Sequence, residues 1–215
     1  MEIYVLYFLE DRAHENFITA LVERIAQEMG VSVKHDVRSA VGGNKVIGEL
    51  KKFIGDFTNN SQNADIFIIA RDSDCKNYSE RVEEIKRIFE NVNPELLEKA
   101  VFCIPDPHIE RWYMEDFEAL RKVLNKNISI DKPKYDCEKN YYKNKLRNIF
   151  REVGSVIGGV EYGDEIVSEI DIYLLEKANA NFGKFVRDLK SLLKKIILRR
   201  IVLISGQNMM TINII

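Results

Sequence analysis

Apolar residues follow two different patterns along the first half of the chain. Almost wholly apolar runs, typical of strands buried on both faces of a parallel sheet, occur at residues 3–9, 65–70 and 100–105. Residues 31–38 instead alternate apolar and polar positions, which predicts a strand with one exposed face. Apolar positions at helical spacing separate and follow these strands, over about 12–29, 46–57, 82–92 and 109–123. The alternation predicts an α/β fold with a mostly parallel sheet of about four strands flanked by helices.

The pattern changes after residue 126. A polar segment leads into a helix, the Gly-rich stretch "GSVIGGVEYGDE" turns the chain, and helical spacing returns over about 164–179 and 181–198. We therefore predict an α/β domain over residues 1–126 and a helical extension over residues 127–215 that packs on it. The apolar, β-prone end of the chain fits a last strand, an interface segment or, over residues 201–215, a non-native end.

Composition narrows the class of protein. Hydrophobic residues make up 46% and charged residues 31% of the chain, a balance typical of globular proteins. The net charge of -2 gives no broad attraction to nucleic acid, so a polyanionic partner would need a local basic patch or a metal. No apolar stretch approaches the roughly 18 residues of a membrane span, and no signal peptide is visible. Cys75, Cys103 and Cys137 form no CxxC pair, and we expect reduced thiols and a cytoplasmic protein.

Carboxylates follow two of the predicted buried strands. Glu10 ends the first strand, and the stretch "FIIARDSDC" places Asp72 and Asp74 just after the third. Side chains two residues apart in a strand face the same way, and neighbouring first and third strands would bring Glu10 beside them. Carboxylates without a cationic partner raise one another's pKa, and a divalent ion relieves that repulsion. Hard oxygen ligands favour Mg²⁺ or Mn²⁺. The alternative is ordinary turn and helix-cap chemistry.

Other candidates lie near the same predicted edge of the sheet. Glu110 follows the fourth strand and either reaches the acidic site or only starts a helix. Lys45 and Arg71 are candidate phosphate contacts at its mouth, and His108 at a strand end is a third.

The remaining reactive residues are expected to be structural. The three histidines show no ligand spacing, so we expect surface or packing roles for His14 and His35. We expect Cys75 to act as a small buried hydrophobe, Trp112 to lie in a core or interface, and Asp116 to be structural. The mixed Lys, Arg and Tyr segment at 139–151 fits a solvated helix face or a nucleic-acid contact.

Four of these segments together resemble the Toprim domain of topoisomerases, primases and overcoming-lysogenisation-defect nucleases. The segments "LEDRAHENFI", "GGNK", "IIARDSDC" and "IPDPHIERWYMED" occur in the family's order over roughly residues 3–120. The chain is most similar to small Toprim-like proteins associated with prokaryotic anti-phage defence. The matching motif positions are Glu10, Glu15, Phe17, Ile109, Glu110, Trp112 and Asp116.

The resemblance implies a metal-dependent nuclease acting on DNA or RNA. In that function Glu10 is general base or metal ligand, and Asp72 and Asp74 hold one or two divalent ions. The family also implies a partner ATPase or another defence protein, and it leaves a homodimer open. Asp11 and His14 depart from the pattern, where Gly and an acid are usual. These departures motivate the alternative of a catalytically degenerate module that acts through a partner protein.

Overall fold

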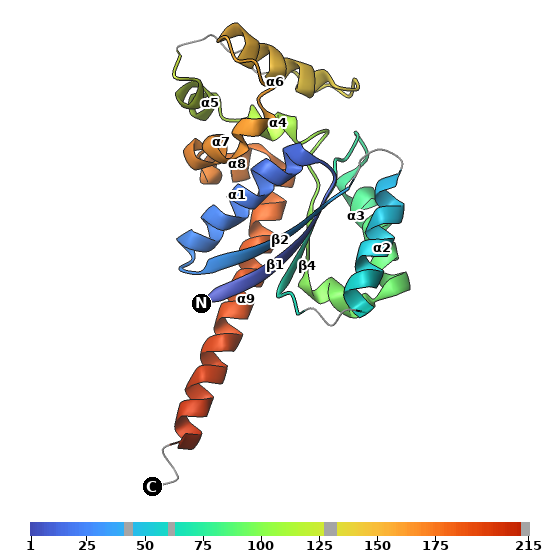
Figure 1. Ribbon diagram of the computed structural model, residues 1–215, viewed down its shortest axis with the longest axis vertical. Coiled ribbons are helices and arrows are strands. Elements are labelled where there is room, and N and C mark those ends of the chain that lie inside the picture. The colour runs from blue at the N-terminus through green and yellow to red at the C-terminus, as the bar shows by residue number, and fades with distance from the viewer. Residues whose placement is uncertain (41–44, 60–62, 127–132, 212–215) are drawn as a thin grey trace.

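Four parallel strands form the centre of the computed structural model, which describes residues 1–40, 45–59, 63–126 and 133–211. Their order across the sheet is β2-β1-β3-β4. The predicted α/β class and parallel sheet are therefore confirmed (Figure 1). The strands are β1 (Glu2–Leu9), β2 (Ser32–Ser39), β3 (Ile66–Ala70) and β4 (Ala100–Cys103).

Alternate side chains of the central strands lie in two separate hydrophobic cores, one on each face of the sheet. In β1, Val5 and Tyr7 are buried in a core on one face of the sheet, whereas Leu6 and Phe8 are buried in a core on the other. This burial on both faces explains why β1 and β3 read as unbroken apolar runs. The edge strand β2 has only exposed and partly buried positions, in agreement with its alternating sequence.

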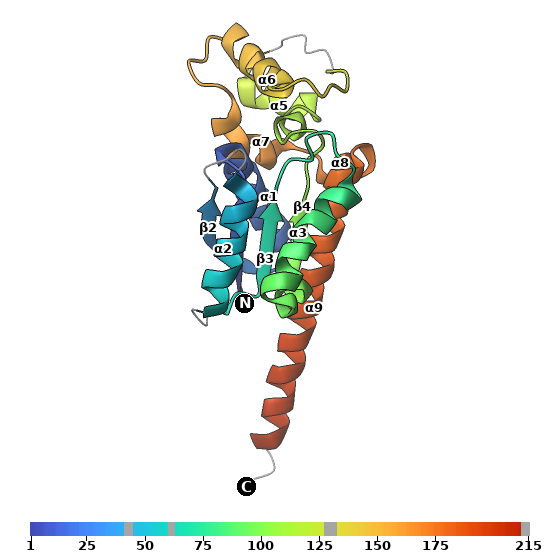
Figure 2. The same ribbon diagram turned by 90° about the vertical axis from the view of Figure 1, so that its right-hand side faces the viewer.

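Helices cover both faces of this sheet (Figures 1 and 2). Helices α1 and α9 pack on one face, and α2 and α3 on the other. The helices are α1 (Arg12–Glu28), α2 (Val46–Asn59), α3 (Tyr78–Val92), α4 (Glu110–Tyr113), α5 (Phe117–Leu124), α6 (Tyr141–Glu152), α7 (Gly163–Glu169), α8 (Ile172–Ala178) and α9 (Ala180–Thr211). Short 3₁₀ helices occur at Pro94–Lys99 and Val160–Tyr162.

The predicted single helix over 109–123 is wrong, because the chain breaks between α4 and α5. Asp116 has an extended backbone, and its Oδ1 accepts the backbone N–H groups of Glu118 and Ala119, each at 3.1 Å. This is N-cap geometry, which starts a new helix. The structural role expected for Asp116 is thus confirmed. Trp112 is fully buried against Phe182 and Phe185 of α9, which confirms its core role.

The helical C-terminal part packs on the sheet through the same core as α1. Tyr113 of α4 donates a hydrogen bond to the carbonyl oxygen of Val160 at 3.1 Å, and Asn181 donates one to that of Ile104 at 2.9 Å. Helix α9 continues to Thr211 and projects beyond the sheet, so the last-strand alternative is wrong (Figure 2). In the part of the chain that the structure describes, no helix has both the length and the apolar character needed to cross a membrane.

The strand order creates a switch point between β1 and β3. The chain leaves β1 outward to β2, then returns to the other side of β1 to form β3. Loops at the carboxyl ends of β1 and β3 therefore diverge, which leaves a crevice where ligands bind in open α/β sheets. Glu10 and Asp72 lie at this crevice.

One tight contact between α8 and α9 gives a stability test. A Cβ built on Gly183 would lie 2.3 Å from the backbone oxygen of Glu176, whereas one on Gly55 in α2 would meet nothing within 4 Å. We expect Gly183→Ala to destabilise the protein by about 1–3 kcal/mol through overpacking. Gly55→Ala should instead be stabilising by about 0.5–1 kcal/mol, because it restricts the unfolded helix segment. Urea unfolding of the two variants measures both effects, and equal stabilities would contradict the packing argument.

Candidate metal centre

Glu10 and Asp72 meet at the carboxyl ends of β1 and β3. The strands pair in parallel with Leu9 opposite Ala70, so the residues that follow leave the sheet side by side. The Glu10 carboxylate accepts the backbone N–H of Asp72 at 2.9 Å. The prediction that the acids of the first and third strands come together is therefore confirmed for this pair.

The loop that follows β3 is fixed against the loop that follows β4. The backbone N–H of Ser73 donates to the Pro105 carbonyl at 2.8 Å. Asp72 Oδ1 accepts the backbone N–H of Ile109 at 2.8 Å, and Oδ2 lies 3.2 Å from Nδ1 of His108. These contacts hold the Asp72 carboxylate in one orientation, with only 13% of its side chain exposed.

His14 is the residue that the sequence reasoning missed. It lies in the first turn of α1 and is fully buried. Its Nδ1 lies 2.8 Å from Asp11 Oδ1, and its Nε2 lies 3.1 Å from Asp72 Oδ1. Glu10, His14 and Asp72 each offer a ligand atom within 4.8 Å of the others, a group that can hold a metal ion. The expected surface or packing role for His14 is therefore incomplete. The available signal was that His14 stands where the Toprim pattern usually has an acid.

Asp74 lies outside this group. Its carboxylate pairs with Arg81 at 2.6 Å, about half of its side chain is exposed, and the nearest His108 contact is 3.9 Å. The predicted set of Glu10, Asp72 and Asp74 thus differs from the set that the structure assembles. The reason is local: β3 ends at Ala70, and by Asp74 the backbone has a left-handed φ of 49°. The two-residue periodicity of a strand no longer applies there.

The charges of the group perturb one another. Burial, and then the neighbouring Asp72 charge, raise the pKa of Glu10 above its usual value. Burial opposes ionisation of Asp72 as well, but the charge of His14 and a hydrogen bond from His108 outweigh it and lower the Asp72 pKa. Burial likewise opposes a charged His14, yet Asp72 and Asp11 raise its pKa well above the usual value. In the absence of metal the group is therefore a buried ion pair beside a carboxyl that holds its proton unusually well.

Glu110 lies beside the group but does not join it. It is the first residue of α4, is 6% exposed and lines the same cavity. Burial, and then the charge of Asp72, raise its pKa. Its predicted part in catalysis stays a prediction.

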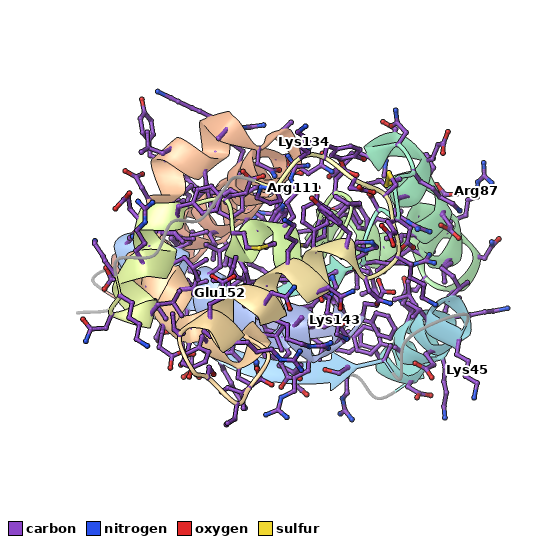
Figure 3. The ribbon with its side chains drawn as sticks, turned by 90° about the horizontal axis from the view of Figure 1, so that it is seen from above. Lys45, Arg87, Arg111, Lys134, Lys143 and Glu152 are labelled. Atoms are coloured by element: carbon purple, nitrogen blue, oxygen red, sulfur yellow. A yellow bond between two sulfur atoms is a disulfide. The ribbon has the colours of Figure 1, made fainter. Side chains whose placement is uncertain are left out.

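A cavity of about 300 Å³ opens above these acids, and its opposite wall is basic. Lys139, Asn140 and Lys143, from the start of α6 and the turn before it, line the cavity together with His108 and Arg71. Figure 3 shows α6 crossing over this end of the molecule, with Lys143 on it. The segment over residues 133–143, which ends with these residues, is called the roof below. A larger cavity, about 850 Å³, lies away from these acids between α1, β2 and α7.

The predicted phosphate contacts have different positions. His108 lines the cavity, as does Arg71, but Arg71 is 14% exposed and pairs with Glu84 at 3.1 Å. Lys45 does not line the cavity and lies apart from Lys143 near the start of α2 (Figure 3). The cations that do face the acids, Lys139 and Lys143, come from the basic segment for which a solvated helix face was the alternative. The pKa of Asp11 is lowered to about 2. Burial opposes this shift, but the hydrogen bond and charge of His14, and then the charge of Lys143, outweigh it.

A disulfide attaches the roof to the loop after β3. Cys75 and Cys137 are bonded, with their Cα atoms 5.9 Å apart, whereas Cys103 is free and buried. The expectation of reduced thiols is therefore wrong for this pair, as is the expectation that Cys75 acts as a buried hydrophobe. The cysteine-based argument for a cytoplasmic setting falls with it. The two residues are 62 positions apart, and no spacing rule pairs them from sequence.

The chain belongs to the family described as Domain of unknown function (DUF4276), whose model matches residues 9–190. Neither the curated proteins nor the solved structures contain a significant match. The family match covers the acids, the roof and most of the helical C-terminal part. The family description assigns no activity.

The geometry predicts that Asp72 is a metal ligand and that Asp74 is not. Loss of even an outer hydrogen-bond partner of a ligand weakens metal affinity by about 10–100-fold, so Asp72→Asn should weaken Mn²⁺ binding at least that much. Asp74→Asn should leave the affinity close to that of the unmodified protein, because Arg81 holds that carboxylate. Isothermal titration calorimetry on EDTA-treated protein makes the comparison. Equal losses in both variants would restore the set predicted from sequence.

The disulfide should hold the roof in place. Replacing both cysteines in a Cys75→Ser, Cys137→Ser variant removes the covalent link without leaving a lone thiol. We expect faster amide hydrogen exchange over residues 133–141, with β1 and β3 unchanged, because only the roof loses its attachment. Hydrogen exchange measured by mass spectrometry reports both regions at once. Unchanged exchange in the roof would mean that side-chain packing alone, such as buried Tyr142, fixes it.

Proposed function

We propose that this member of the DUF4276 family is a metal-dependent nuclease of Toprim type that cleaves phosphodiester bonds in DNA or RNA. The observation that carries the proposal is the cavity with two unlike walls. Glu10 and Asp72 meet on one wall at the switch point of the sheet, and Lys139 and Lys143 lie on the other. Among the described residues, neither lysine forms an ion pair.

The acidic wall suits a divalent ion, for which we propose Mg²⁺ or Mn²⁺. The donor set fits such an ion, since two carboxylates and a buried imidazole offer atoms within 4.8 Å of one another. A bound ion there would supply Lewis-acid chemistry, which neutralises charge on a phosphate and lowers the pKa of a water. Without it, the carboxylates of Glu10, Asp11, Asp72 and Glu110 would repel a phosphodiester.

Glu10 is placed to act as the general base or as a ligand of the ion. Burial and the charge of Asp72 raise its pKa, which moves it toward the range where a carboxylate accepts a proton effectively near neutral pH. Its hydrogen bond from the Asp72 backbone fixes one carboxylate oxygen. The other oxygen then remains for the attacking water or for the ion.

The roof would hold the substrate. Lys139 and Lys143 are exposed, flexible point charges, suited to the non-bridging oxygens of a phosphate. The cavity volume of about 300 Å³ is at the lower end of ligand sites, roughly 300–1,000 Å³. This favours a single-stranded segment or a strand end over a duplex that stays base-paired.

The Toprim type is proposed from the sequence motifs together with their positions. Glu10 follows the central strand β1, and Asp72 and Asp74 follow its neighbour β3. The resemblance is also the support for a role in anti-phage defence, with an ATPase or another defence protein as partner.

Purified protein should cut nucleic acid in a metal-dependent way. We expect cleavage of single-stranded DNA or RNA with Mn²⁺ or Mg²⁺, none with EDTA, and a rate lower by about 100-fold or more in Glu10→Gln, because the base is lost. Lys143→Ala should mainly raise KM. Lys145→Ala is the matched control, since Lys145 lies on the same helix against Tyr141 and does not line the cavity.

Two outcomes would count against the nuclease. Cleavage that survives Glu10→Gln would indicate a contaminating enzyme, and turnover of free nucleotides without polymer cleavage would indicate a phosphohydrolase at the same acids. Equal KM values in Lys143→Ala and Lys145→Ala would mean that Lys143 of the roof does not contribute to substrate binding.

The second candidate is a regulatory module without catalysis. It is favoured by the ion pairs that neutralise the site internally: His14 lies between Asp11 and Asp72, and Arg81 pairs with Asp74. A module of this kind would bind metal without turnover and would co-purify with a stable partner protein. Metal binding with turnover would exclude it.

A further inference from the structure

The Nε2 atom of His14 is buried without a hydrogen-bond partner. The side chain has no exposed surface, and although Nε2 lies 3.1 Å from Asp72 Oδ1, the contact does not have hydrogen-bond geometry. Buried polar atoms are hydrogen-bonded as a rule, so an exception at a cluster of potential ligands calls for an explanation. This atom faces the carboxylates of Glu10 and Asp72.

The other ring nitrogen of His14 is held by Asp11. Asp11 Oδ1 lies 2.8 Å from Nδ1 and also accepts the backbone N–H of His14 at 3.1 Å, which makes Asp11 the N-cap of α1. One carboxylate therefore starts the helix and orients the ring. With a proton on Nδ1, the lone pair of a neutral imidazole is on Nε2 and points at the group. A metal-binding histidine usually donates its other ring N–H to a carboxylate or another acceptor in this way.

We infer that His14 binds the metal directly, in a site of one histidine and two carboxylates with Glu10 and Asp72, and that the site prefers a first-row transition ion such as Mn²⁺ to Mg²⁺. Asp11 is the positioning residue for His14. The inference deepens the proposed function by naming the class of ion, and it rests on the same site.

The spacing of the donors fits one ion. Donor atoms that share an ion at bond lengths of about 2.0–2.2 Å lie about 3–4.4 Å from one another. The three residues offer atoms within 4.8 Å of one another, so small side-chain rotations bring them to a common centre. Asp74 is held away by Arg81 and adds no third carboxylate.

The chemistry of the donors sets the preference. Mg²⁺ takes an octahedron of oxygen ligands, whereas imidazole nitrogen suits later first-row ions such as Fe²⁺ and Zn²⁺, and Mn²⁺ stands between the two classes. A nitrogen in the set therefore costs Mg²⁺ more than it costs a transition ion. The two residues that depart from the Toprim pattern, Asp11 and His14, are thus the ones that alter the metal.

Mn²⁺ electron spin echo spectroscopy tests the ligand directly, without reference to activity. The EDTA-treated full chain, loaded with Mn²⁺, should show modulation from a directly bound ¹⁴N nucleus. His14→Gln should lose that signal, and His35→Gln should keep it. His35 is the matched control, because it also has a carboxylate partner, Glu23 at 2.8 Å, but lies outside the group. Circular dichroism shows whether each variant is folded.

Calorimetry tests the preference. The unmodified protein should bind Mn²⁺ more than about tenfold more tightly than Mg²⁺. His14→Gln and Asp11→Asn should each lower Mn²⁺ affinity by about 10–100-fold, with a smaller effect on Mg²⁺. Asp11→Asn retains the ring, so it tests the positioning role even if His14→Gln does not fold.

Several results would overturn the inference. Mn²⁺ bound without a ¹⁴N signal would mean carboxylate ligands only, and a signal that persists in His14→Gln would point to another histidine, such as His108. No Mn²⁺ binding at all would leave His14 as an ion-pair partner of Asp72. A clear ¹⁴N signal in a protein that cuts no nucleic acid would instead defeat the proposed nuclease and leave this inference standing.

Discussion

The parallel pairing of β1 with β3 is the constraint on which the rest of the site depends. It places Leu9 opposite Ala70, so that Glu10 and Asp72 leave the sheet together and the carboxylate of one receives the backbone N–H of the other. Both strands are buried on both faces, and a slip in register would move every core side chain to the wrong layer. The hydrophobic core therefore fixes the distance between the two acids. Side-chain chemistry acts only after that distance is set.

Charge compensation is the second constraint, because the site gathers more acids than its buried position tolerates. The protein compensates them unequally. Arg81 holds Asp74 at the rim, whereas Asp72 is shared by His14, His108 and a backbone N–H. A metal ion would take over the part played by a charged His14, and the displaced proton would leave with metal binding. Occupancy by metal and the charge on one imidazole are thus linked at a single carboxylate.

Hydrophobic periodicity predicted the class of fold, the strands and the meeting of Glu10 with Asp72. It failed where backbone direction changes within a few residues. At Asp74 a left-handed backbone conformation redirects the chain, and at Asp116 an N-cap does so. Hydrophobic periodicity carries no information about such local features. His14 was missed because its significance comes from a three-dimensional neighbour, Asp72, in the loop after β3. The Cys75–Cys137 link was missed for the same reason, since it joins segments that are distant in sequence.

The covalent link between the loop after β3 and the segment before α6 also determines what a minimal version of the protein contains. A chain shortened to the α/β half would retain Glu10, His14 and Asp72, yet it would lack Lys139 and Lys143 and would expose a single thiol at Cys75 beside the acids. Such a fragment would be strongly acidic at its open edge and prone to form mixed disulfides. The helical half is thus an integral wall of the site.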